Sequence, residues 1–137
     1  MALSDFRMGP LKTILSRDQV DKYLQTLSCP GLALEPPATL PPAAASLYLA
    51  VVMEALLEDP GSEVTLDRLI HLEQSYAFLE PVAVGEPLYL EGWVASVQER
   101  RGQTFFTVVM EGRKSPGGPL ALSGTSRLLL RKEEEAE

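Results

Sequence analysis

The sequence predicts an α+β fold in a single domain. Two helical patterns occupy the first half of the chain, and four long strand patterns follow with no helical pattern between them. Short turns join the last strand patterns, which is typical of an antiparallel sheet. A chain of 137 residues is long enough to bury one hydrophobic core. We therefore expect one domain over residues 1–131 and a disordered acidic tail over residues 132–137.

The first helix is predicted within SRDQVDKYLQTLS, residues 16–28. Ser16 and Gln19 have the spacing of a capping box, in which each side chain accepts a hydrogen bond from the other residue's backbone amide. Val20, Tyr23, Leu24 and Leu27 then repeat at helical spacing. The prolines of the following segment LALEPPATLPP withhold backbone amides, so we expect irregular structure there apart from a short strand at residues 32–35.

The second helix is predicted over residues 43–58, where the sequence is apolar almost all the way round. Such a helix is usually buried on most of its sides. Pro41 and Pro42 precede it, at positions where a missing amide costs nothing. The apolar run is interrupted by Glu54 and is too short to cross a bilayer, so we expect no membrane span. The first residues carry no secretory signal pattern, so we expect a cytoplasmic protein.

The strands are predicted at residues 69–79, 87–98, 104–111 and 119–131, which are rich in Val, Leu, Phe, Tyr and Thr. Alternation along the first of them separates two faces. The face expected to pack on the apolar helix holds Ile70, Leu72, Tyr76 and Phe78. The face expected to point away holds His71, Glu73, Ser75 and Ala77, with His71 and Glu73 close enough to pair.

Composition excludes several classes of function. The formal charge of −7 arises from 12 basic and 19 acidic residues, and no basic run is longer than Arg100-Arg101, so nucleic-acid binding is not expected. A single cysteine, Cys29, excludes an internal disulfide, and with a single histidine we expect no metal site. Asparagine is absent, which is one feature of thermally adapted proteins, and we expect a thermophilic source on that ground.

A buried helix followed by a long antiparallel sheet resembles the hotdog fold. Residues 69–113 and 123–131 are similar to the N-terminal dehydratase half of MaoC-like proteins, in which a His-x-Glu-Gln strand leads to a proline, a Gly-acidic turn and a closing strand that ends in arginine. The matching residues are His71, Glu73, Gln74, Pro81, Gly85, Glu86, Gly102, Ser126 and Arg131. The resemblance covers about residues 15–131 and implies reversible hydration of an enoyl thioester of coenzyme A or acyl carrier protein, with no cofactor beyond that ligand.

Such chemistry needs donors aimed at the thioester carbonyl, and the start of the second helix is expected to supply them, from Ala43, Ala44, Ala45 and Ser46. Catalytic members of the family also carry an Asp-x-Asn-Pro-x-His motif before this helix. The corresponding segment here, SCPGLALEPPATLPP, contains no Asp, Asn or His. The resemblance therefore implies a half that shapes the acyl pocket, as a homodimer or beside a catalytic hotdog subunit.

Several residues have a functional and an ordinary interpretation. His71, Glu73 and Glu54 are candidate acid/base groups, or else strand, interface and helix-surface residues. Gln74, an amide among apolar neighbours, either bonds backbone or meets the ligand. Arg100 and Arg101 contact a coenzyme A phosphate or are solvated turn residues. Two alternative functions stay open: an acyl-CoA thioesterase or hydratase with a relocated acid/base, and a non-catalytic hotdog assembly partner.

Overall fold

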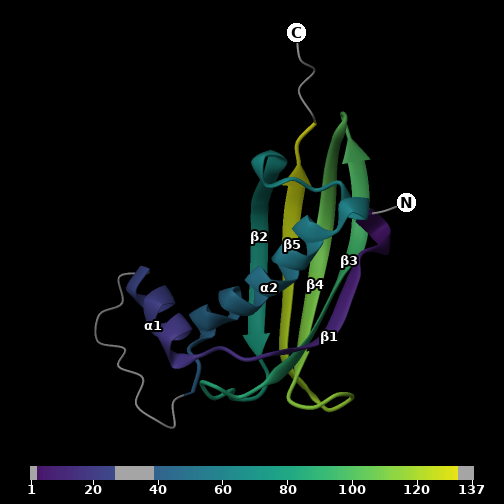
Figure 1. The fold of residues 1–137 in the computed structure, drawn as a ribbon. Coiled ribbons are helices and arrows are strands. Elements are labelled where there is room, and N and C mark those ends of the chain that lie inside the picture. Colours follow the sequence, from purple (N-terminus) through teal and green to yellow (C-terminus); the bar gives the residue numbers. More distant parts are fainter. Residues whose placement is uncertain (1–2, 27–38, 133–137) are drawn as a thin grey trace.

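The computed structural model describes residues 3–26 and 39–132. Its main elements are β1 (Arg7–Thr13), α1 (Arg17–Thr26), α2 (Ala45–Glu58), β2 (Leu69–Phe78), β3 (Leu88–Arg100), β4 (Gln103–Arg113) and β5 (Leu120–Leu130). Short 3₁₀ turns are η1 (Leu3–Asp5), η2 (Pro42–Ala44), η3 (Pro60–Ser62) and η4 (Leu66–Arg68). The strands form one antiparallel sheet in the order β1-β3-β4-β5-β2, and α2 crosses one face of it (Figure 1). The predicted α+β class is confirmed.

The local signals for the helices are confirmed where the structure describes them. The Ser16 amide donates to Gln19 Oε1 at 2.9 Å, and the Gln19 amide donates to Ser16 Oγ at 3.1 Å, so the capping box forms. The second helix begins slightly later than predicted, because Pro42 initiates the 3₁₀ turn η2 before α2 starts at Ala45. None of the helices in the described ranges is both long and apolar enough to cross a membrane. The predicted strand at residues 32–35, Cys29 and residues 133–137 of the predicted tail lie outside the described residues.

One strand was not predicted from the sequence. β1 pairs with β3 at the edge of the sheet, and its register shifts between Met8 and Leu11, where Gly9 and Pro10 interrupt it. Proline cannot donate to a strand partner and glycine weakens a strand pattern, so nothing in this short segment reads as a strand. An edge position tolerates both residues because only one side of the strand is paired.

The core lies between α2 and the sheet. The buried face of α2 holds Ala45, Tyr48, Leu49, Val52 and Leu56. They pack on sheet residues that include Leu88, Leu90, Val108, Met110, Leu122 and Leu128, all under 2% exposed. Close approach depends on Gly92 of β3, because a Cβ there would lie 2.5 Å from Val52 Cγ1.

The faces of β2 differ from the prediction because the strand contains a bulge. Its register with β5 shifts after His71, which lies opposite Leu128, whereas Glu73 lies opposite Arg127. Opposite residues in an antiparallel pair share a face, and the extra residue, Leu72, reverses the alternation. His71 therefore lies on the α2 side with buried Leu128, and the predicted placement away from the helix is wrong.

The bulge also separates His71 from Glu73, so the predicted pairing of the two is wrong as well. Glu73 lies on the face away from α2, as predicted, where its carboxylate is 3.7 Å from Arg127. Ile70 lies opposite Leu129 and so turns away from the helix, contrary to the prediction, while Tyr76 and Phe78 face the helix as expected. Strict alternation therefore predicted the correct face for the second half of β2 and the wrong face for the first half. The alternation of apolar and polar residues does not by itself reveal a bulge.

Candidate functional site

The start of α2 has no side-chain cap. Pro41 precedes η2 in an extended conformation, and neither η2 nor α2 receives a capping hydrogen bond from a side chain. The Ala44 amide donates to the Pro41 carbonyl at 2.9 Å, and the Ala45 amide is directed at the carbonyls of the same turn. Two of the amides expected to polarise a thioester carbonyl are thus used within η2. The positive end of the helix dipole remains as the polarising feature there.

Two of the predicted ligand-contacting residues meet at Tyr76. The Ser46 hydroxyl donates to Tyr76 Oη at 3.3 Å, linking the first turn of α2 to β2. Burial raises the pKa of Tyr76, while hydrogen bonds from Ser46 and Gln74 act in the opposite direction; Tyr23 of α1, nearby, raises it further. Tyr76 is therefore a neutral hydroxyl at ordinary pH, held by Ser46 and Gln74. The sequence indicated this tyrosine only as part of an apolar face.

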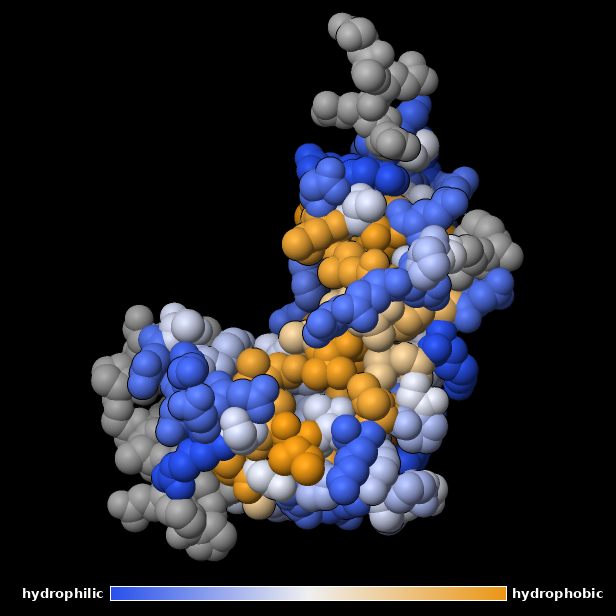
Figure 2. All heavy atoms as spheres, in the orientation of Figure 1, coloured by the Kyte–Doolittle hydropathy of each residue, from blue (hydrophilic) through white to orange (hydrophobic). Residues whose placement is uncertain are grey.

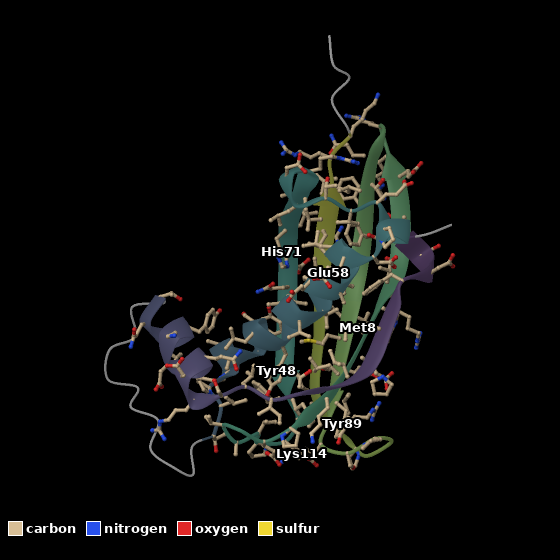
Figure 3. All side chains as sticks on the ribbon, in the orientation of Figure 1. Met8, Tyr48, Glu58, His71, Tyr89 and Lys114 are labelled. Carbon is tan, nitrogen blue, oxygen red and sulfur yellow. The ribbon has the colours of Figure 1, made fainter. Side chains whose placement is uncertain are left out.

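His71 continues the same line of polar groups along β2. Its Nε2 lies 3.3 Å from Oγ of Ser126, a fully buried residue of β5, and Gln74 lies opposite Ser126 in the strand register. Ser46, Tyr76, Gln74, Ser126 and His71 thus form a row on the α2 side of the sheet, which we call the β2 polar line. Figure 3 shows His71 towards the η4 end of β2, whereas Tyr48 of α2 lies near the other end of the sheet.

Comparison with known proteins identifies the family. The family model for the FAS1-like dehydratase domain region matches residues 4–116. The chain belongs to this family. A UPF0336 protein of Saccharopolyspora erythraea is 26% identical over 102 residues, which cover 74% of this chain and 65% of that relative, so this chain matches less than two thirds of its length.

Several solved structures have a fold similar to that of this chain. The chain is similar to a HadBC (3R-hydroxyacyl-ACP dehydratase) complex of Mycobacterium tuberculosis, with TM-score 0.73, 16% identity and coverage of 94% of this chain and 98% of that one. It is also similar to the ChsH1–ChsH2 complex of the same organism, with TM-score 0.61, 9% identity and coverage of 96% and 86%. The predicted hotdog fold is confirmed by these neighbours and by a MaoC-like dehydratase with TM-score 0.72, 12% identity and coverage of 96% of this chain and 43% of that one. The predicted resemblance to a dehydratase family is confirmed by the family model.

Within this FAS1-like dehydratase domain, the other candidate residues lie apart from the β2 polar line. Glu54 is exposed on α2, and Glu73 is on the opposite face of the sheet with Arg127. Arg100 and Arg101 lie at the β3–β4 turn, at one end of the sheet. The structure therefore brings together Ser46, Gln74 and His71 of the predicted residues, and adds Tyr76 and Ser126.

A second tyrosine of the dehydratase domain is buried without a partner. Tyr48 is 0% exposed, and its hydroxyl has no hydrogen-bond partner among the described residues. Burial, together with the charge of Glu86, raises the pKa of Tyr48 to about 12. Glu86 is itself held by the Ala83 amide at 3.0 Å and by Lys114 Nζ at 3.5 Å. Tyr48 consequently stays neutral at any physiological pH.

Proposed function

We propose that this chain is an acyl-thioester-binding dehydratase subunit that acts with a catalytic hotdog partner. The β2 polar line carries the proposal: it offers hydroxyl, amide and imidazole groups beside the positive end of α2, which suit the recognition of a thioester carbonyl. Among the described residues, the chain's one histidine bonds Ser126 and lies on the opposite face of the sheet from Glu73, which supports a chain without an Asp/His dyad of its own. The acid/base that the reaction needs then comes from the partner.

The partner is proposed to pair along β2. The two edges of the sheet are β1 and β2, and only β1 is interrupted by a proline in the strand. Among the described residues, the exposed large apolar side chains include Leu66, Ile70, Leu72 and Leu79, which lie on β2 or within a few residues of it. An unprotected edge flanked by apolar side chains is a site for strand addition. Apolar surface is also visible over α2 and the adjacent sheet (Figure 2).

Neighbouring structures support a heteromeric partner. Two of the solved structures similar to this chain are complexes, HadBC and ChsH1–ChsH2. A homodimer would pair two copies of the same β2 edge and bring together two chains that each lack the dyad motif. A partner hotdog chain that holds the motif would complete one site. The cytoplasmic location and thermophilic source expected from the sequence stay predictions.

Assembly is tested with a matched pair of variants. Leu72 on β2 and Leu11 on β1 are 45% and 48% exposed. We expect Leu72→Asp to release this chain as a monomer from its co-purified complex, because a charge would be buried at the pairing edge. Size-exclusion chromatography with light scattering measures this change. Leu11→Asp should leave the oligomer intact. Dissociation by Leu11→Asp with none by Leu72→Asp would place the partner on the other edge.

Catalytic dependence is tested by hydration of crotonyl-CoA. The purified chain should be inactive alone, and the native complex recovered by co-purification should be active. Gln74→Leu and Tyr76→Phe should lower the affinity of the complex for crotonyl-CoA, with Glu54→Gln on exposed α2 as the control. Full activity of the isolated chain would refute the subunit role.

One observation favours a second function, a thioesterase or hydratase with a relocated acid/base. His71 Nε2 and Ser126 Oγ have the arrangement of a base beside a hydroxyl, although the complete burial of Ser126 argues against a nucleophile that substrate can reach. If this second function is correct, the purified chain alone is active and His71→Gln abolishes that activity. The assembly-only function instead predicts no change in melting temperature with any acyl-CoA, whereas a ligand at 100 times its Kd adds about 2.7 kcal/mol.

A further inference from the structure

Basic side chains gather at one end of the sheet. Antiparallel topology brings together the residue before β2, the β3–β4 turn and the residues after β5, at the upper end in Figure 1. We call the five basic residues of these segments the cationic end: Arg68, Arg100, Arg101, Arg131 and Lys132. They are five of only 12 lysines and arginines in a chain of net charge −7, so the concentration opposes the overall charge.

The three segments of the cationic end are in contact with one another. The Arg131 amide donates to the Arg68 carbonyl at 2.8 Å, and Arg68 Nε donates to the Arg131 carbonyl at 3.0 Å. The Arg131 guanidinium also donates to the Asp67 carbonyl at 2.6 Å. Lys132 reaches the β3–β4 turn, since its Cδ would lie 3.2 Å from a Cβ placed on Gly102. These contacts fix the segments as one surface.

Within the described part of the chain, none of these five cations forms an ion pair with a carboxylate. The ion pairs found there involve other cations, those of Arg17, Lys22, Arg113, Lys114 and Arg127. The hydrogen bonds of Arg68 and Arg131 use backbone carbonyls, which leave the positive charge in place. Clustered, uncompensated guanidinium groups attract multivalent anions, and phosphate oxygens match their geometry.

The β3–β4 turn places an arginine in an unfavourable backbone conformation. Arg101 has φ 55° and Gly102 has φ 80°, both in the left-handed region. A two-residue hairpin turn of this kind is most readily made by Asn-Gly or Asp-Gly. An arginine at the first position is conformationally less favourable than asparagine, and it adds a positive charge at the tip of the hairpin.

The position of the cationic end relates to the partner proposed above, and the inference rests on that function. Antiparallel pairing along β2 brings the first residues of one β2 beside the last residues of the other. In this fold the start of α2 lies beside the later half of β2, as the Ser46–Tyr76 bond shows. The start of the partner's equivalent helix would therefore lie beside the cationic end of this chain.

We propose that the cationic end binds the phosphate groups of coenzyme A. The five cations lie at the ends of four adjacent strands, which are together roughly 14 Å wide at about 4.8 Å per strand spacing. That width suits a pyrophosphate and a 3′-phosphate on one nucleotide.

The test uses variants that leave the Arg68–Arg131 contacts intact. One variant combines Arg100→Gln, Arg101→Asn and Lys132→Gln, since asparagine suits the left-handed turn position. The control removes the same charge elsewhere, with Lys12→Gln, Arg17→Gln and Lys22→Gln. Calorimetry with the co-purified complex measures the Kd of crotonyl-CoA, its 3′-dephospho form and crotonyl-pantetheine.

The first variant should weaken crotonyl-CoA binding by about tenfold or more, since charge-assisted bonds to phosphate are lost. The affinity of the variant for the dephospho form should fall less, and its affinity for crotonyl-pantetheine should not change. Wild-type binding of crotonyl-CoA should also fall with salt more steeply than that of the variant. An unchanged Kd for crotonyl-CoA, or an equal loss for all three ligands, would overturn the proposal.

Unacylated coenzyme A separates this proposal from the proposed function. In one outcome, the wild-type protein binds coenzyme A, the first variant does not bind it, and the acyl group adds no affinity to any crotonyl ligand. The cationic end is then a phosphate site, and the acyl-binding function fails. If crotonyl-pantetheine binds but coenzyme A is insensitive to the variant, the acyl-binding function stands and the cationic end does not bind phosphate.

Discussion

Replacing Tyr48 by Phe is expected to stabilise the protein. The Tyr48 ring is fully buried beneath α2, and its hydroxyl has no hydrogen-bond partner among the described residues. A buried hydroxyl without a partner costs about 1–3 kcal/mol, because it loses its bonds to water on folding. Phe keeps the ring and its packing while removing that cost. The gain is reduced by the small void left by the oxygen, so we expect a net increase of about 1 kcal/mol in the free energy of unfolding at pH 7.

The advantage of Tyr48→Phe should grow at high pH. Folding raises the pKa of Tyr48 from 10.0 to about 12. A raised pKa contributes stability that is complete below pH 10 and is lost as pH rises towards 12, because the unfolded chain ionises first. At pH 11 this loss is about 1 kcal/mol, roughly one pKa unit's worth. The variant lacks the titrating group, so its advantage should reach about 2 kcal/mol at pH 11.

Urea unfolding followed by circular dichroism measures both effects, and at pH 7 the gain corresponds to about 4 °C in Tm. Tyr89→Phe is the control, since Tyr89 lies half-buried on the face of the sheet away from α2. It should change stability by less than about 0.5 kcal/mol at pH 7. Loss of stability in Tyr48→Phe at pH 7 would show that the hydroxyl is bonded in solution, and the reasoning from burial would be refuted.

Three other changes test the packing and local signals. Gly92→Ala should destabilise the protein by about 1–3 kcal/mol in urea, because the new Cβ meets Val52 Cγ1 at 2.5 Å. Combining it with Val52→Ala should cost less than the sum of the two single changes, and simple additivity would rule out the contact as the cause. Ser16→Ala should lower the free energy of unfolding by about 1 kcal/mol through loss of the cap, and an equal effect of Ser16→Thr would count against a capping role. Ser126→Ala removes the group bonded to His71 Nε2 and should alter the His71 ring resonances in NMR spectra, whereas unaltered resonances would mean that the bond is absent in solution.

Much of the fold follows from local features of the sequence. The capping box of Ser16 and Gln19, the prolines before α2 and the residues that end the strands act within a few positions, so their effects are readable from neighbours alone. The apolar character of residues 43–58 predicted a helix against a sheet without any knowledge of contacts. The order of these elements was also enough to indicate the hotdog family.

Tertiary structure decided the site. Leu72 is accommodated as a bulge through pairing with β5, and that one extra residue turns His71 towards α2 and leaves Glu73 on the opposite face. The bond of Tyr76 with Ser46, and the meeting of five cations at one end of the sheet, likewise join segments far apart in the chain. Hydrophobic period reports on a residue's immediate neighbours, whereas strand register depends on the partner strand. For this reason the sequence alone determined the elements of this protein, and only their pairing determined which side chains share a site.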